Sequence, residues 1–100
     1  MTDKIYTIEE IRERIKPIAK QYGVERIYLF GSYARGEATE LSDVDFRIDK
    51  GEIRGLFALG GLYNSLSDAL SKSIDLVTTE SLDPAFINNI ASEEVLLYAN

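Results

Sequence analysis

The segment DVDFRID, residues 43–49, constrains this chain more than any other, because polar and apolar side chains alternate strictly along it. Successive side chains of a β-strand point to opposite faces, so the segment is predicted to be a strand with one buried face. The apolar face would carry Val44, Phe46 and Ile48. The polar face would carry Asp43, Asp45, Arg47 and Asp49. Neighbouring carboxylates on one face are costly without a cation between them, so the strand raises the question of a metal ion.

A helix is predicted over residues 8–21. Thr7 and Glu10 have the spacing of a capping box, in which each side chain satisfies a backbone N–H at the helix start. Gly23 is a natural stop, since glycine accepts the left-handed conformation at a helix end. Pro17 falls inside this pattern and leaves open whether the helix is kinked or divided there.

Two further strands and a short helix follow from local composition. Residues 26–30 (RIYLF) and 74–78 (IDLVT) are short and rich in β-branched or aromatic side chains, which favours strands. The stretch GSYARGEA, beginning at Gly31, is typical of a tight turn that opens a short helix. Ser32 is the candidate N-cap of that helix.

Helical spacing returns over residues 53–70, with an apolar series at Leu56, Leu59, Tyr63, Leu66 and Leu70. A last helix is expected to begin near Asp83-Pro84, and an apolar stretch, 95–98, follows it. Helices and strands therefore alternate, which predicts an α+β, two-layer fold. We expect a small mixed sheet of three to four strands with helices packed on it, in a single domain spanning residues 1–100.

The composition excludes several kinds of chemistry. The chain has no cysteine and no histidine, which rules out disulfides, thiolate nucleophiles, Ser-His-Asp catalysis and imidazole-bound metals. Its formal net charge of -6 argues against direct nucleic-acid binding. No signal peptide or membrane-spanning run is present in the sequence, so a cytoplasmic protein without membrane contact is expected.

Three aspartates form the candidate catalytic and metal-binding set. Asp43 and Asp45 share one strand face, and Asp75 lies in an otherwise apolar strand that can bring it beside them. Carboxylate oxygens are the ligands that Mg²⁺ prefers, and it leaves positions open for water and phosphate. Such a set around two divalent ions supports in-line phosphoryl or nucleotidyl transfer.

Gly31 and Ser32 form the candidate phosphate-binding turn. Glycine lets an anion approach backbone N–H groups at a helix start, and the serine hydroxyl adds a donor. Arg35 and Arg47 are candidate counter-charges for a triphosphate or for leaving pyrophosphate.

Each of these features also has an ordinary structural explanation. The aspartates of 43–45 can belong to a solvated strand face, and Gly31-Ser32 can be a simple turn. Asp75 can pair with Arg26 or Arg35 in a structural salt bridge, and Arg35 can merely hold its loop. The functional interpretation rests on the conjunction of the turn, the paired aspartates and the third aspartate in a protein without histidine.

The stretch GSYARGEATELSDVDF, residues 31–46, resembles the nucleotidyltransferase signature of the DNA polymerase beta superfamily, and the small size points to its minimal nucleotidyltransferase (MNT) branch. The resemblance implies that Asp43, Asp45 and Asp75 are the catalytic and metal-binding residues, with two Mg²⁺ ions likewise implied. It also implies a nucleotide or phosphate-binding role for Gly31, Ser32, Arg35 and Ser42.

Members of the MNT branch transfer AMP from ATP to a hydroxyl, often as antitoxins that modify a tyrosine of a HEPN-domain ribonuclease toxin. The resemblance thus implies a HEPN-type partner, ATP as substrate, and AMPylation as the reaction, in a homo-oligomer or a hetero-oligomer with the partner. Two alternatives remain open. The protein can neutralise its partner by binding alone, or it can transfer a nucleotide to a small molecule.

Overall fold

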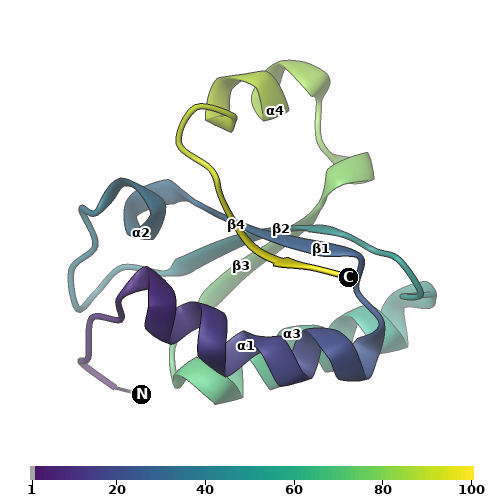
Figure 1. The fold of residues 1–100 in the computed structure, drawn as a ribbon, viewed down its shortest axis with the longest axis horizontal. Coiled ribbons are helices and arrows are strands. Elements are labelled where there is room, and N and C mark those ends of the chain that lie inside the picture. Colours follow the sequence, from purple (N-terminus) through teal and green to yellow (C-terminus); the bar gives the residue numbers. More distant parts are fainter. Residues whose placement is uncertain (1) are drawn as a thin grey trace.

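A four-stranded mixed sheet organises the chain, as the computed structural model of residues 2–100 shows (Figure 1). The strands are β1 (Arg26–Phe30), β2 (Val44–Asp49), β3 (Ile74–Thr78) and β4 (Val95–Ala99). They lie side by side in the order β3-β2-β1-β4. β1 is antiparallel to β2 and β4, whereas β2 and β3 are parallel. The predicted mixed sheet is therefore confirmed, and the apolar stretch near the C-terminus supplies its fourth strand.

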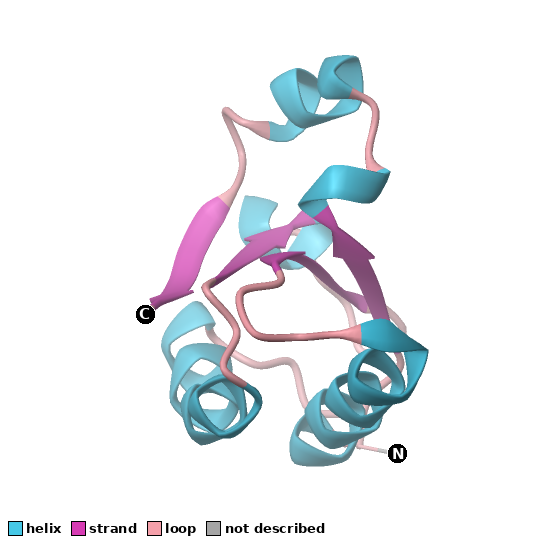
Figure 2. Cartoon of the chain, turned by 90° about the vertical axis from the view of Figure 1, so that its right-hand side faces the viewer, coloured by secondary structure: helices cyan, strands magenta, loops and turns pink. Residues whose placement is uncertain are grey.

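The helices lie on both sides of this sheet. They are α1 (Ile8–Tyr22), α2 (Gly31–Arg35), α3 (Gly55–Leu70) and α4 (Pro84–Ile90), with a short 3₁₀ turn, η1 (Thr79–Ser81), after β3. α1 and α3 cover one face, and α4 lies beyond the other (Figure 2). α3 connects the parallel strands β2 and β3, a connection that needs a crossover. We call the face away from α1 and α3 the open face.

The start and end of α1 agree with its sequence signals. Thr7 and Glu10 form both bonds of the capping box, and Gly23 ends the helix with φ of 70°. Pro17 does not divide the helix, which runs without interruption from Ile8 to Tyr22. Its core-facing stripe consists of Ile11, Ile15 and Ala19.

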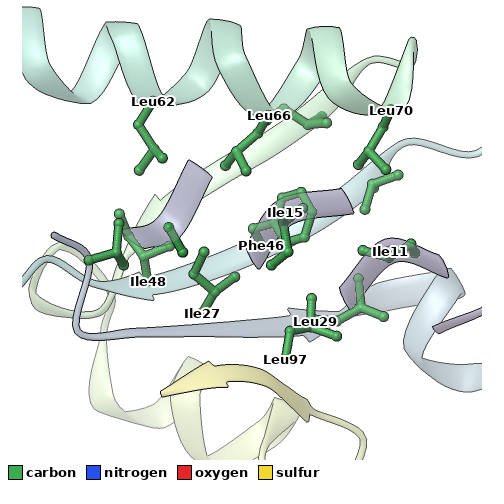
Figure 3. Close-up of a cluster of buried hydrophobic side chains, with 14 of the residues drawn as sticks. Ile11, Ile15, Ile27, Leu29, Phe46, Ile48, Leu62, Leu66, Leu70 and Leu97 are labelled. Atoms are coloured by element: carbon green, nitrogen blue, oxygen red, sulfur yellow. The ribbon is translucent and has the colours of Figure 1, made fainter. Parts of the chain in front are cut away.

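The core lies between the sheet and the pair α1 and α3 (Figure 3). Val44, Phe46 and Ile48 are fully buried in it, as the alternation predicted. Their neighbours include Ile27 and Leu29 of β1 and the buried leucines of α3. Because every second residue of β2 is fixed in this core, the intervening polar side chains are directed to the open face.

The predicted apolar face of α3 is partly wrong. The helix buries Leu62, Leu66 and Leu70, while Leu56 remains 86% exposed and Tyr63 41% exposed. α3 packs against α1 on this side, and at Gly61 a Cβ would come within 2.9 Å of the Tyr22 hydroxyl oxygen. Leu62, the next residue, is buried in the core in place of Tyr63.

No helix within residues 2–100 has both the length and the apolar character needed to cross a membrane.

Candidate active site

The predicted aspartates lie on the open face, near the points where β2 and β3 begin. Asp45 and Asp75 are direct neighbours in the parallel register of β2 and β3. Asp43 comes just before β2 and adds its negative charge to the surroundings of Asp45. We call these three residues the carboxylate cluster. The strand pairing therefore brings together side chains that are far apart in the sequence.

The electrostatics of Asp45 reflect this crowding. Burial raises its pKa to about 6, and the neighbouring Asp75 and then Asp43 contribute further in the same direction. Arg35 opposes the shift only weakly, as the smallest of these influences. A carboxyl group held in such surroundings favours either a proton or a cation beside it.

The carboxylate cluster has no ion-pair partner within residues 2–100. Among residues 2–100, none of its three members forms an ion pair with a Lys or Arg side chain. Arg26 pairs with Asp49 and Glu25, and Arg35 pairs with Glu37 and Glu93. The alternative of a structural salt bridge to Asp75 is therefore not found.

Hard oxygen donors without a counter-charge fit Mg²⁺ by their chemistry. Within the described residues, however, no three acidic side chains converge on a common point at metal-binding distance. The assignment of Asp43, Asp45 and Asp75 as metal ligands therefore remains a prediction.

Gly31 lies directly against the carboxylate cluster. A Cβ built on it would lie 2.1 Å from Oδ2 of Asp45, and its φ of 74° is one that other residues rarely adopt. Phe30, the residue before it, is the register partner of Asp45 on β1. A glycine at position 31 therefore leaves space for the Asp45 carboxylate, a role that the sequence motif does not reveal.

The two predicted serines lie in different local structures. α2 begins at Gly31 with Phe30 as its N-cap and without a capping side chain, so the prediction of Ser32 as N-cap is wrong. The extended backbone of Phe30 ends β1 immediately before α2, which leaves no intervening residue for a polar cap. Ser42 accepts a hydrogen bond from the Thr39 N–H at 2.8 Å and so closes the turn that leads to Asp43. A nucleotide-binding role for either serine stays a prediction.

Arg35 lies at the end of α2 and is held by two carboxylates. Its Nε donates to Glu37 at 2.9 Å, and its NH1 donates to Glu93 at 3.1 Å. These bonds raise the pKa of Arg35, first through Glu37 and then through Glu93. The same Glu93 carboxylate accepts a bond of 3.4 Å from the Gly31 N–H. The candidate phosphate-binding groups thus already share an anion, supplied by the chain itself.

Arg47 proves to be unavailable as a phosphate counter-charge. It is 7% exposed, donates to both oxygens of Glu94 at 2.6 and 2.9 Å, and lies over the Tyr28 ring. Thr79 accepts a further bond from it at 2.6 Å and donates to Asp49. We call Arg47, Asp49, Thr79 and Glu94 the arginine cluster. A buried guanidinium needs such partners, which directs Arg47 away from any ligand.

Sequence reasoning missed the consecutive glutamates Glu93 and Glu94. No motif marks them, and their partners are remote in the chain. One signal for such a partner was present in the sequence, because an arginine on a half-buried strand requires a carboxylate partner elsewhere in the chain.

Sequence reasoning also missed Lys72. It is 3% exposed and donates to the carbonyls of Thr2 and Glu40, which ties the N-terminal segment to the loop before Asp43.

The sequence of the chain matches a known family of nucleotidyltransferases. Residues 13–100 match the sequence model of the family described as polymerase beta, nucleotidyltransferase. The chain belongs to this family. As a nucleotidyltransferase it is an enzyme of the class that the signature of residues 31–46 indicated.

Relatives within this family include proteins named as protein adenylyltransferases. The nucleotidyltransferase is 40% identical over 88 residues to a Methanocaldococcus jannaschii protein named as a putative protein adenylyltransferase, covering 88% of this chain and 95% of that protein. It is 38% identical over 93 residues to the protein adenylyltransferase MntA of Thermococcus cleftensis, covering 89% of this chain and 94% of that protein.

Solved structures share the fold. A toxin–antitoxin crystal structure with AMP-PNP aligns with a TM-score of 0.75 at 24% identity, over 89% of this nucleotidyltransferase and 73% of that chain. A Shewanella oneidensis complex, described as a tri-AMPylated HEPN toxin with an MNT antitoxin, aligns with a TM-score of 0.69 at 21% identity, over 93% and 73% of the two chains. The predicted fold class is thereby confirmed.

Proposed function

We propose that this nucleotidyltransferase transfers AMP from ATP to a hydroxyl of a HEPN-type toxin, with a tyrosine as the acceptor, and so acts as an antitoxin. The observation that carries the proposal is the carboxylate cluster, in which Asp45 and Asp75 lie side by side without a cationic partner among residues 2–100. Relatives named protein adenylyltransferases and fold neighbours in toxin–antitoxin complexes support the choice of substrate and partner.

In the proposed reaction the acceptor oxygen attacks the α-phosphorus of ATP. A new phosphorus–oxygen bond forms, and the bond from the α-phosphorus to the bridging oxygen breaks, releasing pyrophosphate. Asp75 takes part in removing the proton from the acceptor hydroxyl. Arg35 and the Gly31 N–H face the phosphates, with Ser32 and Ser42 as further candidate donors.

The carboxylate cluster would hold Mg²⁺, with two ions as the number proposed. The fit rests on the oxygen donors of all three aspartates and on the raised pKa of Asp45, which marks a place where positive charge is favoured. When bound, the metal neutralises phosphate charge and stabilises the entering and leaving oxygens.

The deciding experiment is the intact mass of a HEPN-domain toxin co-expressed with this protein. We expect one or more AMP additions with the wild type and none with Asp43→Ala. Asp68→Ala is the matched control, because Asp68 is an exposed aspartate of α3, on the opposite side of the sheet. An unmodified toxin in the presence of soluble wild-type protein would contradict the proposal.

Neutralisation by binding alone is the second candidate function. It is favoured by Leu56 and Phe57 of α3, which are 86% and 99% exposed and form an apolar surface suited to a protein partner. In this case the toxin would carry no added mass and would still be neutralised by Asp43→Ala. Transfer to a small molecule would instead appear as ATP turnover without any partner protein.

A further inference from the structure

Glu93 occupies the donors that a triphosphate would use. Its Oε1 accepts from the Gly31 N–H and from Arg35 NH1, both at 3.4 Å, and its Oε2 accepts from the same guanidinium nitrogen at 3.1 Å. The Glu93 side chain is 24% exposed and that of Arg35 is 43% exposed, so the bonds lie at the rim of the open face, where an arriving anion can reach them. A backbone N–H together with a guanidinium is a typical recognition pair for phosphate oxygens.

A carboxylate and a phosphate cannot use these donors together. Each carries negative charge, so the two groups repel each other when they approach the same donors. The Gly31 N–H and Arg35 NH1 both donate to Glu93, and Arg35 Nε donates to Glu37, so a phosphate reaches the Gly31 N–H and Arg35 NH1 only in place of Glu93. An arriving triphosphate therefore has to move Glu93 away.

The surroundings allow Glu93 to move without disturbing the fold. Its neighbour Glu94 is fixed by two bonds to Arg47, and the Glu93 N–H donates to the Ile90 carbonyl at 3.0 Å. Arg35 remains held by Glu37 when Glu93 leaves. The displacement is therefore confined to one side chain on a fixed backbone.

We propose that Glu93 is an internal anion that takes the position of a phosphate group on Arg35 and the Gly31 N–H and that the triphosphate displaces. This inference rests on the proposed function, because it names a regulation of the same site. Glu93 lowers the apparent affinity for the triphosphate by the fraction of molecules in which it is docked. It also keeps Arg35 and the Gly31 N–H paired while no nucleotide is bound.

The test is isothermal titration of two probes, AMP-PNP with Mg²⁺ and inorganic tripolyphosphate, into the wild type, Glu93→Gln and Glu93→Ala. Glutamine keeps the shape of the side chain and removes its charge, so the fold should be retained. We expect both variants to bind each probe about three- to ten-fold more tightly, which corresponds to Glu93 being docked in about 70–90% of molecules. Glu13→Gln, an exposed glutamate of α1, is the charge-matched control and should bind as the wild type does.

The outcomes separate this inference from the proposed function. Tripolyphosphate that binds more tightly to Glu93→Gln, without any nucleotide binding, supports the internal anion and contradicts nucleotidyl transfer. AMP-PNP that binds equally or more weakly to the Glu93 variants overturns the internal anion and leaves the proposed function standing. Binding of neither probe to any variant overturns both.

Discussion

β2 carries two polar clusters on its open face that differ in how their charges are balanced. In the arginine cluster, Arg47 meets Glu94 at 2.6 Å and Asp49 accepts from Thr79 at 2.6 Å, so the central charges have partners. In the carboxylate cluster, Asp45 lies beside Asp75 with no ion pair to either among residues 2–100. One cluster therefore stabilises the fold, and the other leaves its acidic groups without an ion-pair partner among residues 2–100.

The pKa values follow the same division. Burial alone would raise the pKa of Asp49, but hydrogen bonds from Thr79 and Arg26 and the charge of Arg47 hold it below its ordinary value. Burial also raises the pKa of Asp45, and its acidic neighbours add to that shift instead of opposing it. Two aspartates on the same face of one strand are thus tuned in opposite directions by their partners.

The largest expected effect comes from removing one charge of the carboxylate cluster. Asp75→Asn should lower AMP transfer to a HEPN-type partner by about 10³-fold, because it removes a proposed metal ligand that is also the proposed acceptor of the hydroxyl proton. Its melting temperature in chelator should be unchanged or slightly raised, since Asp75 is exposed and adds repulsion to the native state. Quantitative mass spectrometry of the partner checks the rate, with Asp68→Asn as the control. A variant that retains full transfer would exclude Asp75 from the reaction.

The second largest effect is a loss of stability when the arginine cluster is disrupted. Glu94→Ala should lower the free energy of unfolding by about 3 kcal/mol, because it leaves the buried Arg47 without its main carboxylate partner. Denaturant unfolding measures this change. Adding Arg47→Met to Glu94→Ala should recover part of the loss by removing the orphaned charge. Glu13→Ala, on the exposed side of α1, should change stability by less than about 0.5 kcal/mol. An equal response of Glu94→Ala and Glu13→Ala would remove the distinction between the two clusters.

A smaller effect is expected from pH. The pKa of Asp45 is about 6 in the folded chain, above the ordinary value of about 3.9 in an unfolded one. The folded state therefore binds more protons between these values, and this group's contribution to stability is full below pH ~4 and is lost as the pH rises through ~6.

Asp45→Asn should remove that part of the pH dependence. In chelator at pH 7.5 the variant should be more stable than the wild type by about 1 kcal/mol, a figure reduced for the partial solvent exposure of Asp45. Melting curves from pH 4 to 8 would show this as a flatter profile. Parallel profiles for the wild type and Asp45→Asn would contradict the shift.

The smallest effect is the response of the wild type to magnesium. At a concentration a few times the dissociation constant, binding to the folded state alone should add about 0.5–1 kcal/mol. The advantage of Asp45→Asn should then shrink or reverse, because the variant lacks one ligand. Calorimetric melts with and without Mg²⁺ measure this, and Glu94→Gln should retain the response. If the melting temperature of the wild type is the same with and without Mg²⁺, the result would count against a metal site.

Local sequence signals were sufficient for most of the fold. The capping box at Thr7, the alternation of β2 and the Asp83-Pro84 helix start act within a few residues, so they can be identified without knowing the tertiary structure. The burial of Leu62 in place of Tyr63 could not be predicted in this way, because it depends on how α3 packs against α1, which Gly61 approaches at Tyr22.

The same distinction applies to the site. The pairing of Asp45 with Asp75 was predictable, because the alternation of β2 determines on which face of the sheet Asp45 lies. The one further assumption was that β2 and β3 are neighbouring strands. The ion pairs of Arg47 with Glu94 and of Arg35 with Glu93 were not predictable. A long, flexible arginine side chain can reach several carboxylates, and only the folded structure determines which of them lies within reach. Sequence therefore located the acidic groups better than the basic ones.

The parallel pairing of β2 with β3 has a consequence for the order in which the chain folds. β1 and β2 are antiparallel and close in sequence, whereas β3 can join only after α3 has crossed over the sheet. We therefore expect Asp45 to meet Asp75 late in folding. We expect Asp45→Asn in chelator to slow unfolding and leave the folding rate unchanged in stopped-flow experiments. A faster folding rate would show instead that the two carboxylates already repel each other in the transition state.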